Sequence, residues 1–272
     1  MYPKVSVIMG VYNCASTLSN SIDSLLAQTF TDWELIMCDD GSIDNTYQIA
    51  EAYAKKYPNI KLIKNEKNLG LNQTLNNCLK LAKGKYIARQ DGDDESLPAR
   101  FEKEVAFLDN NLEYAIVGCA KYHFDQDGIW GLSKGIEYPI KYTFIKGTPF
   151  SHPCTMVRRE AFDAVAGYTV DARLIRVEDY HLWAKMYVLG YKGYNIQEPL
   201  YMFRDDCNSM SRRNFKARWN GFYLRNHIIR MFKLPFYYHF LTIRPLLVWC
   251  IPSLFYNYLH RRYLKQMNGR IS

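Results

Sequence analysis

The strongest constraint on this chain is an alternation, from Val5 to Arg89, between short β-rich apolar runs and stretches with helical periodicity. The run Val5–Met9 is compact and apolar, as a buried strand is, and Ser16 can cap a helix whose apolar residues recur at helical spacing. Further strands are expected at 33–38, 60–63 and 85–89, and further helices at 46–56 and 71–82. This alternation predicts a parallel α/β sheet with right-handed crossovers, which binds ligands at the carboxyl ends of its strands.

Regular structure is also expected after this region, with longer gaps. Pro98 suits the first turn of a helix, because proline has no N–H to leave unpaired there. A strand is expected at 114–124 and a helix at 178–189. The residues from 126 to 150 are rich in Gly, Tyr and Lys and fit neither pattern, so we expect irregular structure there.

Two of the predicted strands end in carboxylates. Asp39 and Asp40 follow the second strand, and the sequence 91–94 (Asp-Gly-Asp-Asp) follows the fourth. Paired carboxylates in a turn can hold Mg²⁺ or Mn²⁺, and such an ion neutralises the charge that grows on a diphosphate leaving group. Asp40 can accept the N–H of a nucleotide base. The alternative is an acidic surface turn, in which Asp and Gly are common.

The last part of the chain differs in charge and hydropathy from the rest. After Asp206 there is no Asp or Glu, whereas twelve Lys or Arg residues follow. The stretch Leu234–Leu259 is apolar and aromatic but contains Arg244 and several prolines, so broken interfacial helices fit it better than a spanning helix. We therefore expect a catalytic domain at 1–211 and a basic helical extension at 212–272 that contacts a membrane. Packing of this extension on the catalytic domain is the alternative.

The cysteines and the start of the chain indicate the cellular compartment. Seven cysteines are scattered singly, an odd number without zinc-site spacing, which favours a reducing compartment over a disulfide framework. The chain runs into its first strand without a charged leader, so no signal peptide is expected. Together with the basic, aromatic extension, these features predict a cytoplasmic protein that is peripheral at the inner face of the cell membrane.

Several short motifs follow one another in a recognisable order. The chain resembles the family 2 glycosyltransferases with the GT-A fold, a mainly parallel mixed sheet flanked by helices. The matching segments are 5–13 (VSVIMGVYN), 24–30 (SLLAQTF), 39–42 (DDGS), 68–70 (NLG), 88–94 (ARQDGDD), 152–153 (HP), 167–168 (GY) and 178–183 (EDYHLW). Each motif alone is weak, but their common order over residues 4–211 is specific.

The resemblance implies roles for individual residues. Six residues are implied to bind the nucleotide sugar: Val11, Tyr12, Asn13, Asp40, Arg89 and Asp91. For Arg89 the alternative is an ion pair with a carboxylate of the acidic turn. Asp93 matches the family's metal ligand, and Asp179 its catalytic base. Family 2 enzymes generally invert the anomeric carbon, so Asp179 would remove the proton of an acceptor hydroxyl. An acidic pair at a helix start also suits the helix dipole without any catalysis.

Further residues have weaker assignments. Glu178 would orient Asp179 or the acceptor, Trp183 would stack on a sugar or fill the core, and His152 would line the acceptor side or lie in a loop. Arg204 and Ser211 are candidate diphosphate contacts. Two positions depart from the family: Gly10 stands where many relatives have Thr or Pro, and Asp206 where many have a histidine.

The resulting expectation is an inverting, Mn²⁺- or Mg²⁺-dependent transfer from a nucleotide-diphospho-sugar, with a uridine donor favoured, to a lipid-linked or polysaccharide hydroxyl. A metal-dependent nucleotidyl- or phosphotransferase is an alternative, although no glycine-rich phosphate loop stands out. A non-catalytic binder of nucleic acid or membranes is another, but the apolar density of the tail disfavours nucleic acid. The sequence leaves homo-oligomerisation open.

Overall fold

A computed structural model describes residues 2–206, 215–243, 262 and 264 of the chain. The strands are β1 (Val5–Val11), β2 (Trp33–Asp39), β3 (Ile60–Lys64), β4 (Tyr86–Arg89), β5 (Glu95–Ser96), β6 (Tyr114–Asp125), β7 (Gly128–Ser133), β8 (Thr155–Arg158) and β9 (Lys192–Arg204). The helices are α1 (Leu18–Leu26), α2 (Thr46–Lys56), α3 (Leu71–Leu81), α4 (Arg100–Asn110), α5 (Thr143–Lys146), α6 (Arg159–Ala164), α7 (Glu178–Val188) and α8 (Phe215–Met231), with 3₁₀ turns η1 (His152–Cys154), η2 (Ala172–Leu174) and η4 (Phe236–Ile243).

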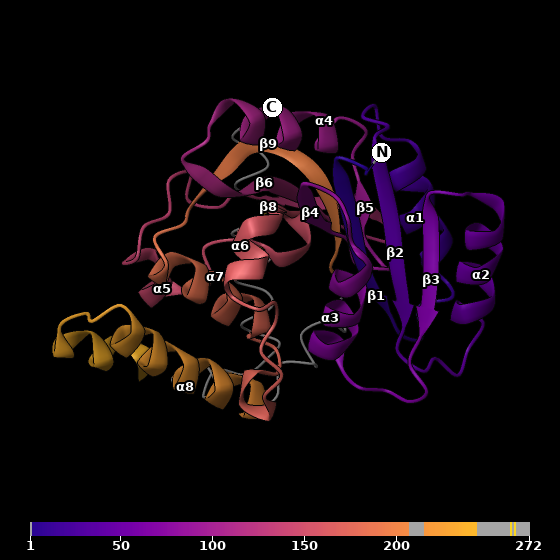
Figure 1. Ribbon diagram of the computed structural model, residues 1–272. Helices are drawn as coiled ribbons and strands as arrows, with labels where there is room; N and C mark the ends of the chain where they lie inside the picture. Colours follow the sequence, from indigo (N-terminus) through magenta and orange to yellow (C-terminus); the bar gives the residue numbers. More distant parts are fainter. Residues whose placement is uncertain (1, 207–214, 244–261, 263, 265–272) are drawn as a thin grey trace.

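The strands form one mixed sheet in the order β3-β2-β1-β4-β8-β6-β9-β5, and β7 pairs with β6 (Figure 1). The first four strands in this order are parallel, because each is joined to the next along the chain by a crossover helix. Strands β8, β7 and β5 pair antiparallel with their neighbours, and β9 runs parallel to β6. The predicted mixed α/β sheet flanked by helices is therefore confirmed, but parallel pairing prevails only among β3, β2, β1 and β4.

Helices cover both faces of the sheet, because alternate side chains of a strand point to opposite faces. In β1, Val5, Val7 and Met9 pack with residues of α1, α2 and α4, whereas Ile8 belongs to the core cluster that contains residues of α3, α6 and α7. All four of these side chains are completely buried. This two-sided burial explains why β1 reads as a continuous apolar run rather than an alternating one.

Three local expectations are corrected. Ser16 is not the N-cap of α1, which begins at Leu18 after Thr17 and has no side-chain cap. The helix after Pro98 begins only at Arg100. The segment 126–150 is not wholly irregular, since it contains β7 and α5.

The helix α8 lies beyond the predicted domain boundary, yet it packs against the main body below α5 and α7 (Figure 1). Its Leu224 and Ile228 are buried in the same core cluster as Trp183 of α7. The boundary itself, at 211/212, lies outside the described residues. In the part of the chain that the structure describes, no helix has the length and apolar character that crossing a bilayer requires. The five described cysteines are free thiols.

Candidate active site

A cleft of about 830 Å³ opens at the carboxyl ends of β1, β2 and β4. Parallel strands end at the same edge of the sheet, so residues that follow different strands meet there. The lining includes Tyr12 and Asn13 after β1, Asp40 after β2, and the acidic turn after β4; Glu178 completes it from the start of α7. The other predicted residues in the lining are Val11, Arg89, Asp91, Asp93 and Arg204. Most of the predicted site residues therefore converge on one cleft.

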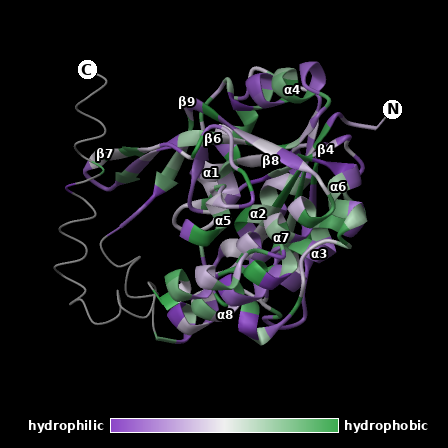
Figure 2. Cartoon of the chain, turned by 90° about the vertical axis from the view of Figure 1, so that its left-hand side faces the viewer, coloured by the Kyte–Doolittle hydropathy of each residue, from purple (hydrophilic) through white to green (hydrophobic). Residues whose placement is uncertain are grey.

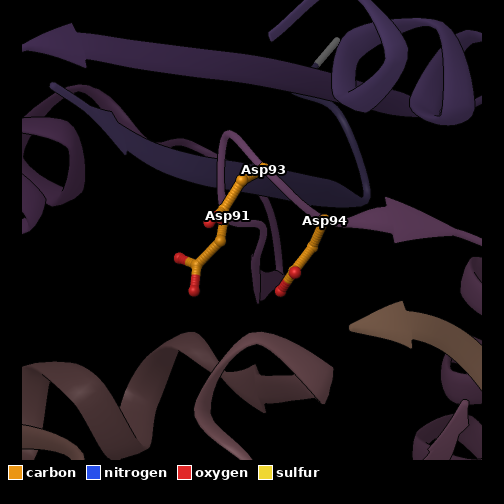
Figure 3. A group of neighbouring side chains, drawn as sticks. All are labelled: Asp91, Asp93 and Asp94. Atoms are coloured by element: carbon orange, nitrogen blue, oxygen red, sulfur yellow. The ribbon is translucent and has the colours of Figure 1, made fainter. Parts of the chain in front are cut away.

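The acidic turn 91–94 brings three carboxylates together. One oxygen from each of Asp91, Asp93 and Asp94 lies within 4.8 Å of the others, and Figure 3 shows Asp91 and Asp94 pointing to the same side of the turn. Asp94 is only 1% exposed; its Oδ1 accepts the N–H of Arg204 at 2.7 Å, while its Oδ2 has no hydrogen-bond partner among the described residues. Burial, followed by the charges of Asp91 and Asp93, raises the pKa of Asp94.

This donor set fits a hard divalent cation. Mg²⁺ and Mn²⁺ prefer carboxylate oxygens, and a buried carboxylate oxygen without a partner is costly unless a proton or a cation satisfies it. The sequence indicated Asp93 as the metal ligand and Asp91 beside it, but it gave no role to Asp94. The run of acidic residues at 91–94 could have indicated Asp94 as a further ligand. The burial of Asp94 could not be predicted, because Asp94 is contacted by Arg204 of β9, which is distant in the sequence.

Behind the acidic turn lies Arg89, whose guanidinium is 4% exposed and forms an ion pair with Asp91. Its Nη1 lies 2.6 Å from Nδ1 of His152, and Nε2 of His152 lies 2.8 Å from the hydroxyl of Tyr168. Burial, and then the charge of Arg89, lowers the pKa of His152 well below its usual range, so the imidazole is neutral. The prediction that His152 lines the acceptor side is wrong, because it supports Arg89 from beneath the cleft.

Asp40 shapes one wall of the cleft. Its Oδ1 accepts the N–H of Leu69 and the amide of Asn65, both at 2.8 Å, and its Oδ2 accepts the N–H of Gly70 at 2.9 Å. These bonds hold the segment 68–70, which also lines the cleft. Asp40 thus has a structural role at the rim, and its contact with a base stays a prediction.

Tyr12 and Asn13, which follow β1, also line the cleft. The Tyr12 side chain is 47% exposed in the cleft, which leaves its ring accessible to a planar base. Asn13 has a positive φ of 49°, and its Oδ1 accepts the N–H of Ile43 at 3.0 Å. The amide of Asn13 therefore joins the ends of β1 and β2.

The helix α7 begins with Glu178 and Asp179. Glu178 lines the cleft, whereas the next residue, Asp179, is partly buried and is not part of the lining. Burial, followed by the charge of Glu178, raises the pKa of Asp179 to about 7. Burial also raises the pKa of Glu178. A carboxyl with a pKa near neutrality can both take up and release a proton under cellular conditions.

Three remaining predictions have different outcomes. Trp183 is completely buried and packs against Phe150 and His152, so of its two predicted roles it fills the core and does not stack on a sugar. Arg204 lines the cleft, and its Nε donates to the carbonyl of Asp93 at 3.1 Å. Ser211 lies outside the described residues.

Comparisons with known proteins agree with this geometry. Residues 6–166 match the family model described as glycosyl transferase family 2. The chain is 42% identical to the protein named "Putative glycosyltransferase EpsE" of Bacillus subtilis, with 99% of this chain and 98% of that protein aligned. It is 30% identical over 218 residues to the UDP-Glc:alpha-D-GlcNAc-diphosphoundecaprenol beta-1,3-glucosyltransferase WfaP of Escherichia coli, which covers 78% of this chain and 81% of WfaP.

Solved structures show the same fold. Staphylococcus aureus TarS, crystallised with UDP-GlcNAc, superposes with a TM-score of 0.67 at 21% identity, over 83% of this chain and 66% of that one. The mannosyltransferase PcManGT of Pyrobaculum calidifontis, in complex with GDP-Man and Mn²⁺, superposes with a TM-score of 0.64 at 16% identity, over 99% of this chain and 85% of that one. The predicted GT-A fold is confirmed by these superpositions.

Proposed function

Because the chain belongs to glycosyl transferase family 2, we propose that it moves a sugar from a nucleotide-diphosphate donor to a hydroxyl of a lipid-linked or polysaccharide acceptor, with inversion at the anomeric carbon. One observation carries the proposal. Asp40, Asp93 and Glu178 come from distant parts of the sequence, yet all three line a single cleft, with Asp179 next to Glu178. A glycosyltransferase needs a surface that binds the nucleotide, a site for the diphosphate and a general base, and these residues can supply the three parts.

The diphosphate site is the acidic turn with its two arginines. Asp91, Asp93 and Asp94 would hold Mg²⁺ or Mn²⁺, which when bound neutralises the charge that develops on the departing diphosphate. Arg89 orients the carboxylate of Asp91 through their ion pair. Arg204 bonds the carbonyl of Asp93 and lines the cleft, where its guanidinium is available to phosphate oxygens.

Asp179 is the proposed general base. With a pKa raised to about 7, its carboxylate is a stronger proton acceptor than an ordinary aspartate and is still ionised at slightly alkaline pH. It takes the proton of the acceptor hydroxyl as that oxygen attacks the anomeric carbon. Glu178 raises the basicity of Asp179 by its charge and remains available, at the cleft surface, to hydrogen-bond the acceptor.

The names of similar proteins support a class of donor and a pathway. WfaP is named as a UDP-glucose enzyme that acts on a diphospholipid-linked sugar, and TarS was crystallised with UDP-GlcNAc. The amylovoran biosynthesis glycosyltransferase AmsE is 28% identical to this chain. A uridine-linked donor and a role in the synthesis of a surface polysaccharide are the proposals that these similarities support.

The proposed membrane contact has a structural counterpart in η4. Phe236, Tyr237 and Phe240 are 76%, 60% and 68% exposed on this short element, which packs against α8. Figure 2 shows α8 at the lower edge of the molecule, with both hydrophilic and hydrophobic residues along it. The surrounding sequence after residue 206 has basic residues and no acidic ones, which suits anionic headgroups. We propose that η4 lies on the inner face of the cell membrane, where it would keep the cleft near a lipid-linked acceptor.

Point substitutions test the membrane contact better than truncation at residue 211, because α8 contributes Leu224 and Ile228 to the core. The variant Phe236→Ser/Phe240→Ser should lose flotation with vesicles that contain phosphatidylglycerol. Ile43→Ser is the matched control, since Ile43 is 89% exposed on a loop outside the basic part of the chain. Equal flotation of wild type and the double variant would refute the contact.

A donor screen tests the transfer itself. Purified protein is incubated with UDP-, GDP- and dTDP-sugars, with and without Mn²⁺ or Mg²⁺, and the released nucleotide is measured. The proposal expects metal-dependent release of a nucleoside diphosphate. Release of pyrophosphate instead would indicate a nucleotidyltransferase.

A further inference from the structure

A buried ion pair lies beneath the acidic turn and takes no part in the proposed chemistry. Arg100 and Glu104, on α4, are both 0% exposed, and Nε of Arg100 lies 3.3 Å from Glu104. Burial raises the pKa of Glu104 to about 7, and only one of its oxygens has a hydrogen-bond partner among the described residues. Burying such a pair is often no more stabilising than an apolar core would be. Stability alone is therefore a weak reason for its presence.

The contacts of Arg100 point to the acidic turn. Its guanidinium has five N–H groups, and the structure provides five hydrogen bonds for them. Besides Glu104, they reach the carbonyls of Arg89 and Thr155 at 3.0 and 3.3 Å, Oε1 of Gln90 at 3.3 Å, and Oγ of Ser96 at 2.9 Å. Arg89 and Gln90 immediately precede the turn 91–94, and Ser96 follows it. One buried side chain thus fixes both ends of the turn.

Gln90 extends this support into the turn. Its side chain is 0% exposed; Oε1 accepts from Ser96 and Arg100, while Nε2 donates to the carbonyl of Asp94 at 2.9 Å and to Oγ of Ser21 at 3.1 Å. The hydroxyl of Ser21 donates in turn to the carbonyl of Asp91 at 2.7 Å. The amide of Gln90 therefore links the guanidinium of Arg100 to the first and last carbonyls of the turn.

All four carbonyls of the turn are held by side chains from outside it. Ser21 holds that of Asp91 and Gln90 that of Asp94; Thr17 donates to the carbonyl of Gly92 at 2.9 Å, and Arg204 to that of Asp93 at 3.1 Å. With its backbone fixed in this way, the turn presents its carboxylates at a set spacing. A cation pays less reorganisation free energy when its ligands are already in place.

We propose that Arg100 and Gln90 are positioning residues that set the affinity of the acidic turn for a divalent cation. The inference rests on the proposed metal-dependent transfer, but it can fail independently of it. Neither residue lines the cleft, so neither is expected to touch the nucleotide, the sugar or the cation. Both act through the backbone of the turn.

The test separates positioning from stability by removing the ion pair as a unit. In Arg100→Met/Glu104→Met, two apolar side chains replace the pair, and such replacements are often neutral or stabilising. Because Gln90, Ser96 and two backbone carbonyls also lose the donor Arg100, we expect the melting temperature to fall, as in the control below, so the Mn²⁺ affinity is the discriminating measurement. The dissociation constant for Mn²⁺, measured by electron paramagnetic resonance in the presence of saturating UDP, should rise about 10-fold or more, as for other groups that orient metal ligands. Gln90→Met, which keeps the length of the side chain, should raise it similarly.

Arg158→Met is the matched control. Arg158 is another buried arginine, 7% exposed, which donates to the carbonyls of Leu108, Asn111 and Tyr114 at the opposite end of β4. This variant should lower the melting temperature and leave the Mn²⁺ dissociation constant unchanged. Wild-type affinity for Mn²⁺ in both Arg100→Met/Glu104→Met and Gln90→Met would overturn the inference. A wild-type protein that binds UDP but no Mn²⁺ would instead refute the metal-dependent transfer on which the inference rests.

Discussion

The guanidinium of Arg89 and the imidazole of His152 are in direct contact below the cleft, with Nη1 of Arg89 2.6 Å from Nδ1 of His152. Because the imidazole is neutral, one of its nitrogens accepts from Arg89 while the other is available to the hydroxyl of Tyr168. The same guanidinium is paired with Asp91. His152 thus determines where Arg89 lies and, through Arg89, where one carboxylate of the acidic turn lies.

The first prediction concerns this contact. His152→Leu removes the acceptor for Arg89 and leaves a buried charged donor unsatisfied, which costs roughly 1.5–3 kcal/mol. We expect the KM for the donor to rise about tenfold, because Arg89 no longer holds Asp91 in place. His152→Gln retains an acceptor and should stay within about threefold of the wild type. Steady-state kinetics with varied donor would test this, and equal KM values for the two variants would contradict it.

The second prediction concerns the cation. Asp93→Asn keeps the shape of the side chain but removes one negative charge from the set Asp91, Asp93 and Asp94. Substitution of residues that only orient metal ligands lowers metal affinity by about 10–100-fold. Loss of the charge of a ligand itself should therefore weaken Mn²⁺ binding by more than about 100-fold. Metal-stimulated release of nucleotide should disappear. Asp127→Asn, on an exposed turn outside the cleft, is the control and should behave as wild type. Unchanged Mn²⁺ stimulation in Asp93→Asn would exclude Asp93 as a ligand.

The third prediction concerns pH. A general base acts only when ionised, and the pKa of Asp179 is raised to about 7, first by burial and then by the charge of Glu178. The value of kcat/KM should therefore fall about tenfold per pH unit below pH 7 and level off above it. Glu178→Gln removes the neighbouring charge, so the midpoint should move to lower pH. A pH–rate profile of each protein gives the test, and a midpoint that moves upward or not at all in Glu178→Gln would contradict it.

The sequence carried enough information for the sheet and for most of the cleft. The helix Thr46–Lys56 was predicted with the bounds that it has, because its apolar positions are periodic and its neighbours are turn residues. Asp40 and Asp93 were found by one rule, that residues after parallel strands meet at one edge. Local periodicity and the order of strands were sufficient for these predictions.

What escaped prediction depends on contacts between distant segments. For Trp183 the core was one of the two predicted roles and is the one found, whereas the burial of His152 against Trp183 and Arg89 is not revealed by a histidine in a predicted loop. The support of the acidic turn by Arg100 escaped because Arg100 reads as an ordinary charged residue near the start of a helix. Similarly, the mainly polar sequence of α8 conceals that Leu224 is a core residue. Burial of single residues among polar neighbours has no periodic signature.

The final prediction links activity to stability at Asp179. The pKa of its carboxyl is about 7 in the folded protein against an ordinary value of 3.8, so the unfolded chain loses this proton first as pH rises. The contribution of Asp179 to folding stability therefore declines between pH 4 and pH 7 and is lowest above pH 7. Three pKa units correspond to about 4 kcal/mol, and the partial exposure of Asp179 reduces this to about 1–2 kcal/mol. Asp179→Asn has no proton to lose, so it should be more stable than wild type at pH 8 and similar to it at pH 4.

Thermal unfolding at pH 4 and pH 8 tests the predicted stability. At pH 8 the melting temperature of Asp179→Asn should exceed that of the wild type by roughly 2–4 °C for each kcal/mol gained. In the same variant, transfer should fall about 10²–10⁴-fold, the usual contribution of a general base, while affinity for UDP stays unchanged. A catalytic group held in an unfavourable environment gives this combination of gained stability and lost activity, whereas a helix-start residue favoured by the helix dipole gives the opposite change in stability. A lower melting temperature for Asp179→Asn at pH 8 would therefore identify Asp179 as a structural residue and leave the reaction without its proposed base.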